Sequence, residues 1–115
     1  MKKLNSNRIG IDSGVTPLFS DFAEGGEMWT GSDARECKVA VEFSEPFLSP
    51  PTVHAGFALW DISNEAGTRV DLATETITEH GFTIRFTTWG DTKIARMRVN
   101  WMAIGEVEDS ELWDV

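Results

Sequence analysis

The chain has 115 residues, of which 41% are hydrophobic and 25% are charged. This length and balance fit one globular domain and argue against a disordered chain. With 19 acidic and 10 basic side chains the formal net charge is -9, so nucleic acids and anionic membrane surfaces would repel the protein at long range. Neither is expected as a partner.

The first residues and the cysteine content bear on where in the cell the protein is expected. Met-Lys-Lys-Leu begins like the basic region of a signal peptide, but polar residues 5–8 follow where an apolar core would stand, so no signal peptide is predicted. No apolar run reaches the length that spans a bilayer, and we expect a soluble protein. Cys37 is the single cysteine, which excludes an intrachain disulfide. A cytoplasmic and a disulfide-free exported protein both remain compatible.

Hydrophobic periodicity predicts an all-β fold. Val39, Val41 and Phe43 alternate with polar residues, as expected of a strand with one buried face. Turn-forming residues separate the predicted strands, and no window of a dozen residues has a helical stripe. Short strands at this spacing favour a sandwich or a barrel. The six predicted strands span residues 8–12, 37–43, 52–60, 68–73, 81–88 and 92–104.

The segment between the first two strands carries few signals. Its larger apolar side chains, Phe19, Phe22 and Met28, indicate a loop packed on the edge of the sandwich. We therefore divide the chain into an N-terminal strand and loop (1–27), a main domain (28–105) and an acidic C-terminal tail (106–115). The tail contains Leu112 and Trp113, and is either a frayed end or a docking strand for another protein.

The last predicted strand has two substantial faces. One face carries Ala95, Met97, Val99, Trp101 and Ala103, a core row, and the other carries Ile94, Arg96, Arg98, Asn100 and Met102. Two adjacent arginines on one face require carboxylate partners. These partners lie either in a surface ladder within the chain or in a neighbouring subunit.

Catalytic and metal-binding patterns are largely missing from the sequence. His54 and His80 are far apart and lack ligands at metal-binding spacing, and no nucleophile elbow, phosphate-binding glycine loop or calcium loop is present. Cys37 heads a predicted strand, where a small buried hydrophobic residue is expected. Two of the many acids could flank a glycosidic bond, but a β domain of this size rarely builds a deep cleft. We predict no enzyme, no metal and no cofactor.

An ordered series of sequence blocks resembles the H-type lectin domain family. The resemblance runs from about residue 28 to residue 105, and the series is more specific than any single block. The blocks are VEFSEPF (41–47), PPTV (50–53), LWDI (59–62), TRV (68–70), IT (77–78) with GF (81–82), TWGDTK (88–93) and VNWMAIG (99–105). The resemblance implies a six-stranded antiparallel β-sandwich that assembles as a trimer and binds galactose or N-acetylgalactosamine without a metal.

In this family the sugar lies between neighbouring subunits. The resemblance assigns one wall to Arg69, Trp89, Gly90 and Asp91, and the opposite wall, from the neighbouring chain, to Gly31, Ser32 and Asp33. A one-residue gap makes Asp33 the first choice on that wall and Ser32 the second. Gly90 stands where a family member has a histidine that touches sugar, and this removes one side-chain contact. Asp91 either supplies a replacement acceptor or caps the turn.

Each main site residue also has a purely structural interpretation. A pyranose has apolar C–H patches and a rim of hydroxyls, so a tryptophan face, an arginine donor fork and an aspartate acceptor suit it. Trp89 could instead pack on its own hairpin edge, Arg69 could pair with one of the many acids, and Asp33 could serve a turn. The main functional hypothesis is a trimeric glycan-binding module, and the alternative is a structural attachment element of a larger assembly, such as a phage-like particle or secreted fibre, with a degenerate sugar site.

Overall fold

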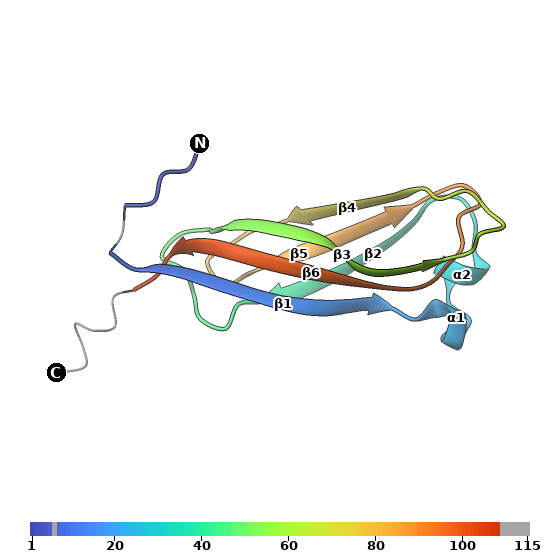
Figure 1. Cartoon of the computed structure of the whole chain (residues 1–115), viewed down its shortest axis with the longest axis horizontal. Helices are drawn as coiled ribbons and strands as arrows, with labels where there is room; N and C mark the ends of the chain where they lie inside the picture. The colour runs from blue at the N-terminus through green and yellow to red at the C-terminus, as the bar shows by residue number, and fades with distance from the viewer. Residues whose placement is uncertain (6, 109–115) are drawn as a thin grey trace.

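The computed structural model describes residues 1–5 and 7–108 and confirms the all-β antiparallel fold. Two three-stranded antiparallel sheets pack face to face, with strand orders β1-β6-β3 and β2-β5-β4 (Figure 1). Within the described residues no helix is long and apolar enough to cross a membrane. The elements are β1 (Ile9–Phe19), α1 (Asp21–Glu24), α2 (Glu27–Thr30), β2 (Arg35–Glu42), β3 (Thr52–Ile62), β4 (Val70–Glu75), β5 (Gly81–Thr88) and β6 (Ile94–Glu106).

The core lies between the two sheets and is built from the inward rows of β5 and β6. Phe82, Ile84 and Phe86 of β5 are nearly inaccessible to solvent. The predicted core row of β6 is also buried, because alternate residues of a strand point to the same face. Ile94 differs from the prediction: it is fully buried although the alternation assigns it to the outer face. The pairing of β3 with β6 shifts register next to Ile94, and such an irregularity changes which face a side chain occupies.

The structure of the N-terminal region differs from the prediction in the length of its strand and in the segment that follows. The first strand runs to Phe19 instead of ending at residue 12, and two four-residue helices follow instead of a loop alone. Pro17 is tolerated because β1 is an edge strand and needs no second ladder partner. Gly14 lies opposite Trp101, whose indole occupies the space that a side chain at position 14 would need. These two residues look like strand breakers in the sequence but are accommodated by their neighbours.

Of the two arginines on the outer face of β6, one forms an ion pair within the chain. Arg96 Nε lies 3.2 Å from Asp61 Oδ2, directly across the ladder to β3. Arg98 is exposed and has no ion-pair partner among the described residues. Cys37 packs against the core cluster of Met28, Phe86 and Met97 but is only partly buried, whereas the sequence predicts a buried residue.

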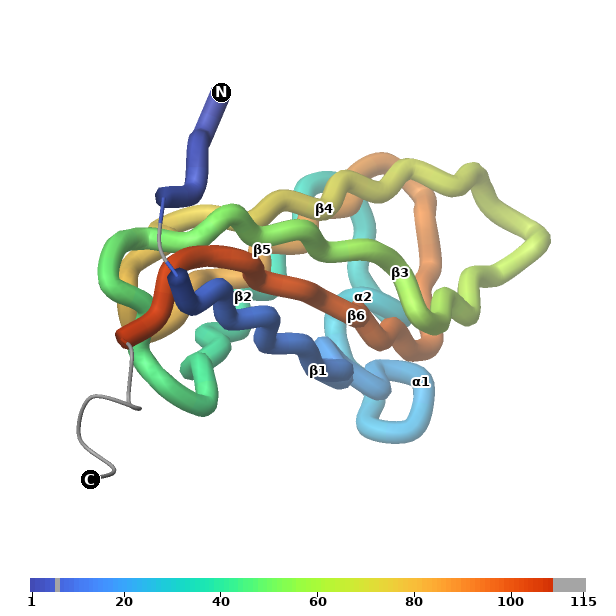
Figure 2. The backbone as a smooth tube through the Cα atoms, turned by 60° about the vertical axis from the view of Figure 1, so that its left-hand side comes forward, coloured from blue at the N-terminus to red at the C-terminus, as the bar shows by residue number. Residues whose placement is uncertain are grey.

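Several connections between strands lie together at one end of the sandwich. The turn between β5 and β6, the loop between β3 and β4, and the helices α1 and α2 all lie at this end (Figure 1). The start of β1 and the end of β6 lie at the opposite end, as the second view also shows (Figure 2). Of the predicted tail, residues 109–115, including Leu112 and Trp113, lie outside the described residues.

Candidate functional site: the turn after strand β5

The connection between β5 and β6 brings the predicted aromatic residue to the surface. Trp89 directly follows β5 and is 45% exposed, although its neighbour Thr88 is almost fully buried. Gly90 has a φ of 70°. This left-handed conformation reverses the chain, and glycine adopts it without steric cost. The backbone conformation of the turn therefore accounts for a glycine at this position.

Arg69 and Asp91 face each other at this turn. Arg69 Nη1 lies 3.2 Å from Asp91 Oδ1, and both side chains are well exposed, at 48% and 69%. The backbone N–H of Gly67 donates to the same carboxylate oxygen at 3.3 Å. The salt bridge that the sequence allowed for Arg69 is therefore present, and its partner is another predicted site residue. Arg69 lies just before β4 and not within the strand, where the sequence had placed it.

Two buried threonines hold the backbone of Arg69 from both sides. Thr92 Oγ1 accepts a hydrogen bond from the Arg69 N–H at 3.0 Å and donates to the Gly67 carbonyl at 2.7 Å. Thr88 Oγ1 donates to the Arg69 carbonyl at 2.5 Å. Because both threonines flank the tryptophan turn, they tie the start of β4 to that turn. Sequence reasoning missed them as positioning residues, although Thr88 shares the inward phase of Phe82, Ile84 and Phe86.

The segment of residues 31–33 lies on the other side of the same turn. The Asp33 N–H donates to the Gly90 carbonyl at 2.8 Å, and Asp33 has a φ of 59°. Gly31 closes α2, because its N–H donates to the Glu27 carbonyl at 2.8 Å. Ser32 and Asp33 are exposed. Asp33 is thus held through its backbone against the turn of its own chain, and its side chain is left at the surface.

A buried arginine that sequence reasoning missed organises this region. Arg35 is 5% exposed and donates to the carbonyls of Met28, Asp33 and Gly90 at 3.0–3.3 Å, and to that of Glu27 at 3.4 Å. Its guanidinium thereby joins α2, the segment 31–33 and the turn after β5. The signal was available, because Arg35 is in phase with Cys37, Val39 and Val41 on the inward face of β2.

Together these residues form an exposed, polar surface with one aromatic side chain. A tryptophan ring, a guanidinium and two carboxylates lie around one turn, where they can contact apolar C–H groups and hydroxyls. Within residues 1–5 and 7–108, no group of three or more His, Cys, Asp or Glu side chains is arranged to hold a metal ion.

Comparisons with known proteins agree with this architecture. A profile of the H-type lectin domain matches residues 38–104, more than half of the chain. A protein of Fuscovulum blasticum described as "ATP synthase subunits region ORF 7" is 49% identical over 107 residues, which are 93% of each chain. Discoidin-1 of Dictyostelium discoideum is 31% identical over 96 residues, covering 81% of this chain and 38% of that protein.

The solved structure of discoidin II from Dictyostelium discoideum has the same fold. It superposes with a TM-score of 0.75 at 24% identity, covering 91% of this chain and 40% of discoidin II. The chain therefore spans well under half the length of the discoidins that it matches. H-type lectin domains are carbohydrate-binding modules. Because the profile covers more than half of the sequence and the two-sheet fold is shared, the chain belongs to the H-type lectin domain family.

Proposed function

We propose that this protein is a metal-independent lectin for galactose-type or N-acetylgalactosamine-type surface glycans, with its sugar sites at the junctions between the chains of a homotrimer. The observation that carries the proposal is the grouping of Arg69, Asp91 and the exposed Trp89 around one turn. Two buried threonines fix the backbone of Arg69 there, so its side chain starts from a defined position.

Each exposed group has a role that matches its chemistry. The ring of Trp89 packs against the apolar C–H face of the pyranose, and the Arg69 guanidinium donates hydrogen bonds to ring hydroxyls. The pair of Arg69 and Asp91 is exposed, and exposed ion pairs contribute about 0–1 kcal/mol to stability. Sugar hydroxyls can therefore share or replace this pair at small cost. Asp91 then serves as an acceptor in place of the side chain that glycine lacks at position 90.

The strand order favours a site shared between chains. Asp33 precedes β2 and Arg69 precedes β4, and these strands form the two edges of the sheet β2-β5-β4. Neighbouring strands are about 4.8 Å apart, so the two backbones are separated by about 10 Å within one chain. In a ring closed by head-to-tail contacts, two different surfaces meet at each junction, and we take these surfaces to be the β2 edge of one protomer and the β4 edge of the next. Asp33 of one protomer then approaches Arg69 of its neighbour.

Assembly explains how a shallow site reaches useful strength. A single open sugar site buries little area and replaces hydrogen bonds to water at modest net gain. Several such sites on one particle engage a glycan-covered surface together, and the second contact is made at a high effective concentration. Function is therefore expected to depend on the oligomer.

Binding of the assembled protein to a glycan array tests the sugar claim. We expect binding to terminal galactose or N-acetylgalactosamine, and its loss in Arg69→Ala and Trp89→Ala without loss of the trimer in light scattering. Trp60→Ala is the matched control, because Trp60 is also exposed, at 58%, but lies on β3 outside the site. A verified trimer that binds no glycan would instead support a structural attachment element, and a monomeric mass would contradict the assembly.

Mixed trimers test where the site lies. Asp33→Ala and Arg69→Ala proteins are each inactive alone if both residues contact sugar. In a trimer refolded from both, one junction joins an intact Arg69 to an intact Asp33, so binding returns if the site is shared between protomers. A site within one protomer never regains both residues. Because only one site per mixed trimer is restored, recovery is measured by titration with free monosaccharide, where avidity plays no part. Absence of recovery in that titration, with inactive parent variants, would overturn the shared site.

The glycine of the turn allows a test of specificity. Gly90→His introduces the side chain that a family member uses, and histidine is among the residues enriched in the left-handed conformation. We expect tighter binding of N-acetylgalactosamine relative to the parent protein. An unchanged preference would show that position 90 does not face the sugar.

A further inference from the structure

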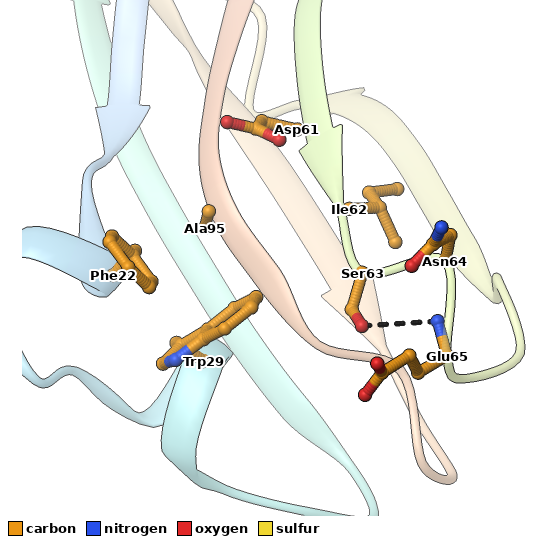
Figure 3. Close-up of a pocket in the computed structure, with 8 residues that line it drawn as sticks. All are labelled: Phe22, Trp29, Asp61, Ile62, Ser63, Asn64, Glu65 and Ala95. Carbon is orange, nitrogen blue, oxygen red and sulfur yellow. Dashed lines mark hydrogen bonds between the residues drawn. The ribbon is translucent and has the colours of Figure 1, made fainter.

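A pocket at the same end of the molecule contains none of the residues assigned to sugar binding. It lies between the α1–α2 segment and the loop that follows β3, above the first residues of β6 (Figure 3). Its volume is about 610 Å³. The side chains around it are Phe22, Trp29, Asp61, Ile62, Ser63, Asn64, Glu65 and Ala95.

Two aromatic rings form one wall of this pocket. The ring centroids of Phe22 and Trp29 are 5.0 Å apart, and the ring planes meet at 85°. Phe22 is 63% exposed and Trp29 is half-buried. Rings at right angles form a corner, whereas a flat sugar face is better matched by one open ring. A corner of this kind surrounds a compact, rounded group from two sides.

The opposite wall carries negative charge. Glu65 extends from the loop after β3 on the side of the pocket that faces Trp29 (Figure 3). Its backbone N–H donates to Ser63 Oγ at 3.2 Å, which holds the loop in place. In the described part of the chain the Glu65 carboxylate has no ion-pair partner, while Asp61 is already paired with Arg96 at 3.2 Å. No basic side chain is among the residues that line the pocket.

We propose that this pocket binds a small organic cation, namely a quaternary or alkylated ammonium group. Aromatic faces attract such a cation through the negative potential above their rings, and the Glu65 carboxylate supplies the opposite charge. The alkyl groups of the cation contact Ala95 and the rings. A simple metal ion is poorly matched to this lining, because Glu65 is its one unpaired carboxylate and the described residues hold no group of three or more His, Cys, Asp or Glu side chains arranged around a metal ion. The net charge of -9 further favours cations at this surface.

Titration of the full chain with tetramethylammonium and choline, followed by NMR at constant ionic strength, tests the site. We expect saturable shifts in the indole N–H of Trp29 and the amides of Ala95 and Glu65. A neutral analogue, 3,3-dimethylbutan-1-ol, has the shape of choline without the charge and should bind several-fold more weakly. Glu65→Gln and Phe22→Leu should each weaken binding about two- to five-fold.

Matched variants and competing ligands separate the alternatives. Trp60→Ala removes an exposed tryptophan outside the pocket, and Trp89→Ala removes the ring of the sugar site, so both should leave cation binding unchanged. Equal binding of the neutral analogue would identify a merely apolar pocket, and shifts of the same resonances by galactose would identify a sugar subsite. Either result, or the absence of saturable shifts, would overturn the proposal. Glu65→Gln changes an exposed loop residue, so its result does not depend on a refolded core.

Discussion

Thr92 is expected to determine how firmly Arg69 is held. Thr92→Val keeps the shape of the side chain but removes a hydroxyl that bonds the Arg69 N–H at 3.0 Å and the Gly67 carbonyl at 2.7 Å. Thr92 is fully buried, so water cannot easily replace it. Leaving a partly buried donor and a partly buried acceptor without partners costs about 1 kcal/mol each, and we expect the free energy of unfolding to fall by about 2 kcal/mol.

Urea unfolding and glycan binding measure the two consequences of this change. A loss of about 2 kcal/mol lowers the urea midpoint by about 1 M for a domain of this size, and lowers the melting temperature by about 8 °C. Sugar avidity should fall as well, because Arg69 starts from a looser backbone. Thr87→Val is the matched control, since it lies on the other face of β5 and should change stability by less than about 0.5 kcal/mol. Equal stabilities of Thr92→Val and the parent protein would refute the reasoning.

Three further predictions concern the buried arginine, the turn and the cysteine. Arg35→Lys should lower the free energy of unfolding by about 2–3 kcal/mol in urea, because one ammonium group cannot reach four carbonyls on separate segments; a loss below about 0.5 kcal/mol would contradict this. Gly90→Ala and Gly25→Ala, with φ of 70° and 68°, should each lower the free energy of unfolding by about 1–2 kcal/mol in thermal melts. Only Gly90→Ala should alter glycan binding, since Arg69 lies beside position 90 whereas no described side chain lies near position 25; equal binding by both variants would contradict this. Burial, helped by the nearby charge of Asp21, raises the pKa of the Cys37 thiol. A raised pKa means less thiolate at a given pH, so iodoacetamide at about pH 8 should alkylate the folded chain more slowly than the urea-unfolded chain, and equal rates would argue against burial.

Alternation of apolar residues was sufficient to predict most strands and their inward faces. The rows of β5 and β6 carry large apolar side chains at every second position, and such a pattern can bury only one face of a strand. Strand β1 was harder, because Gly14 and Pro17 are ordinary breakers and become acceptable only beside Trp101 and at a sheet edge. The short helices were missed because four residues are too few to show a helical period.

The candidate site likewise contains residues that the sequence indicated and residues that only the structure revealed. The sequence by itself identified Trp89, Arg69, Asp91 and Asp33 as residues suited to sugar, through the blocks that resemble a lectin family. It did not identify which residues hold them. For Arg35 a signal was present, because this residue shares the alternation of the inward apolar residues of β2 and its side chain is therefore expected to point into the core.

The sequence alone determined the all-β class, the inward rows of the strands and the chemistry offered at the tryptophan turn, because these depend on residue type and on spacing of a few positions. Only the tertiary structure decided that Arg69 pairs with Asp91, 22 positions away, and that Thr92 holds the Arg69 backbone across 23 positions. Such contacts depend on which strands pair, in which register, and where a bulge shifts a side chain to the other face. The corner of Phe22 and Trp29 opposite Glu65 arises in the same way, from segments that are joined only when the sheets pack.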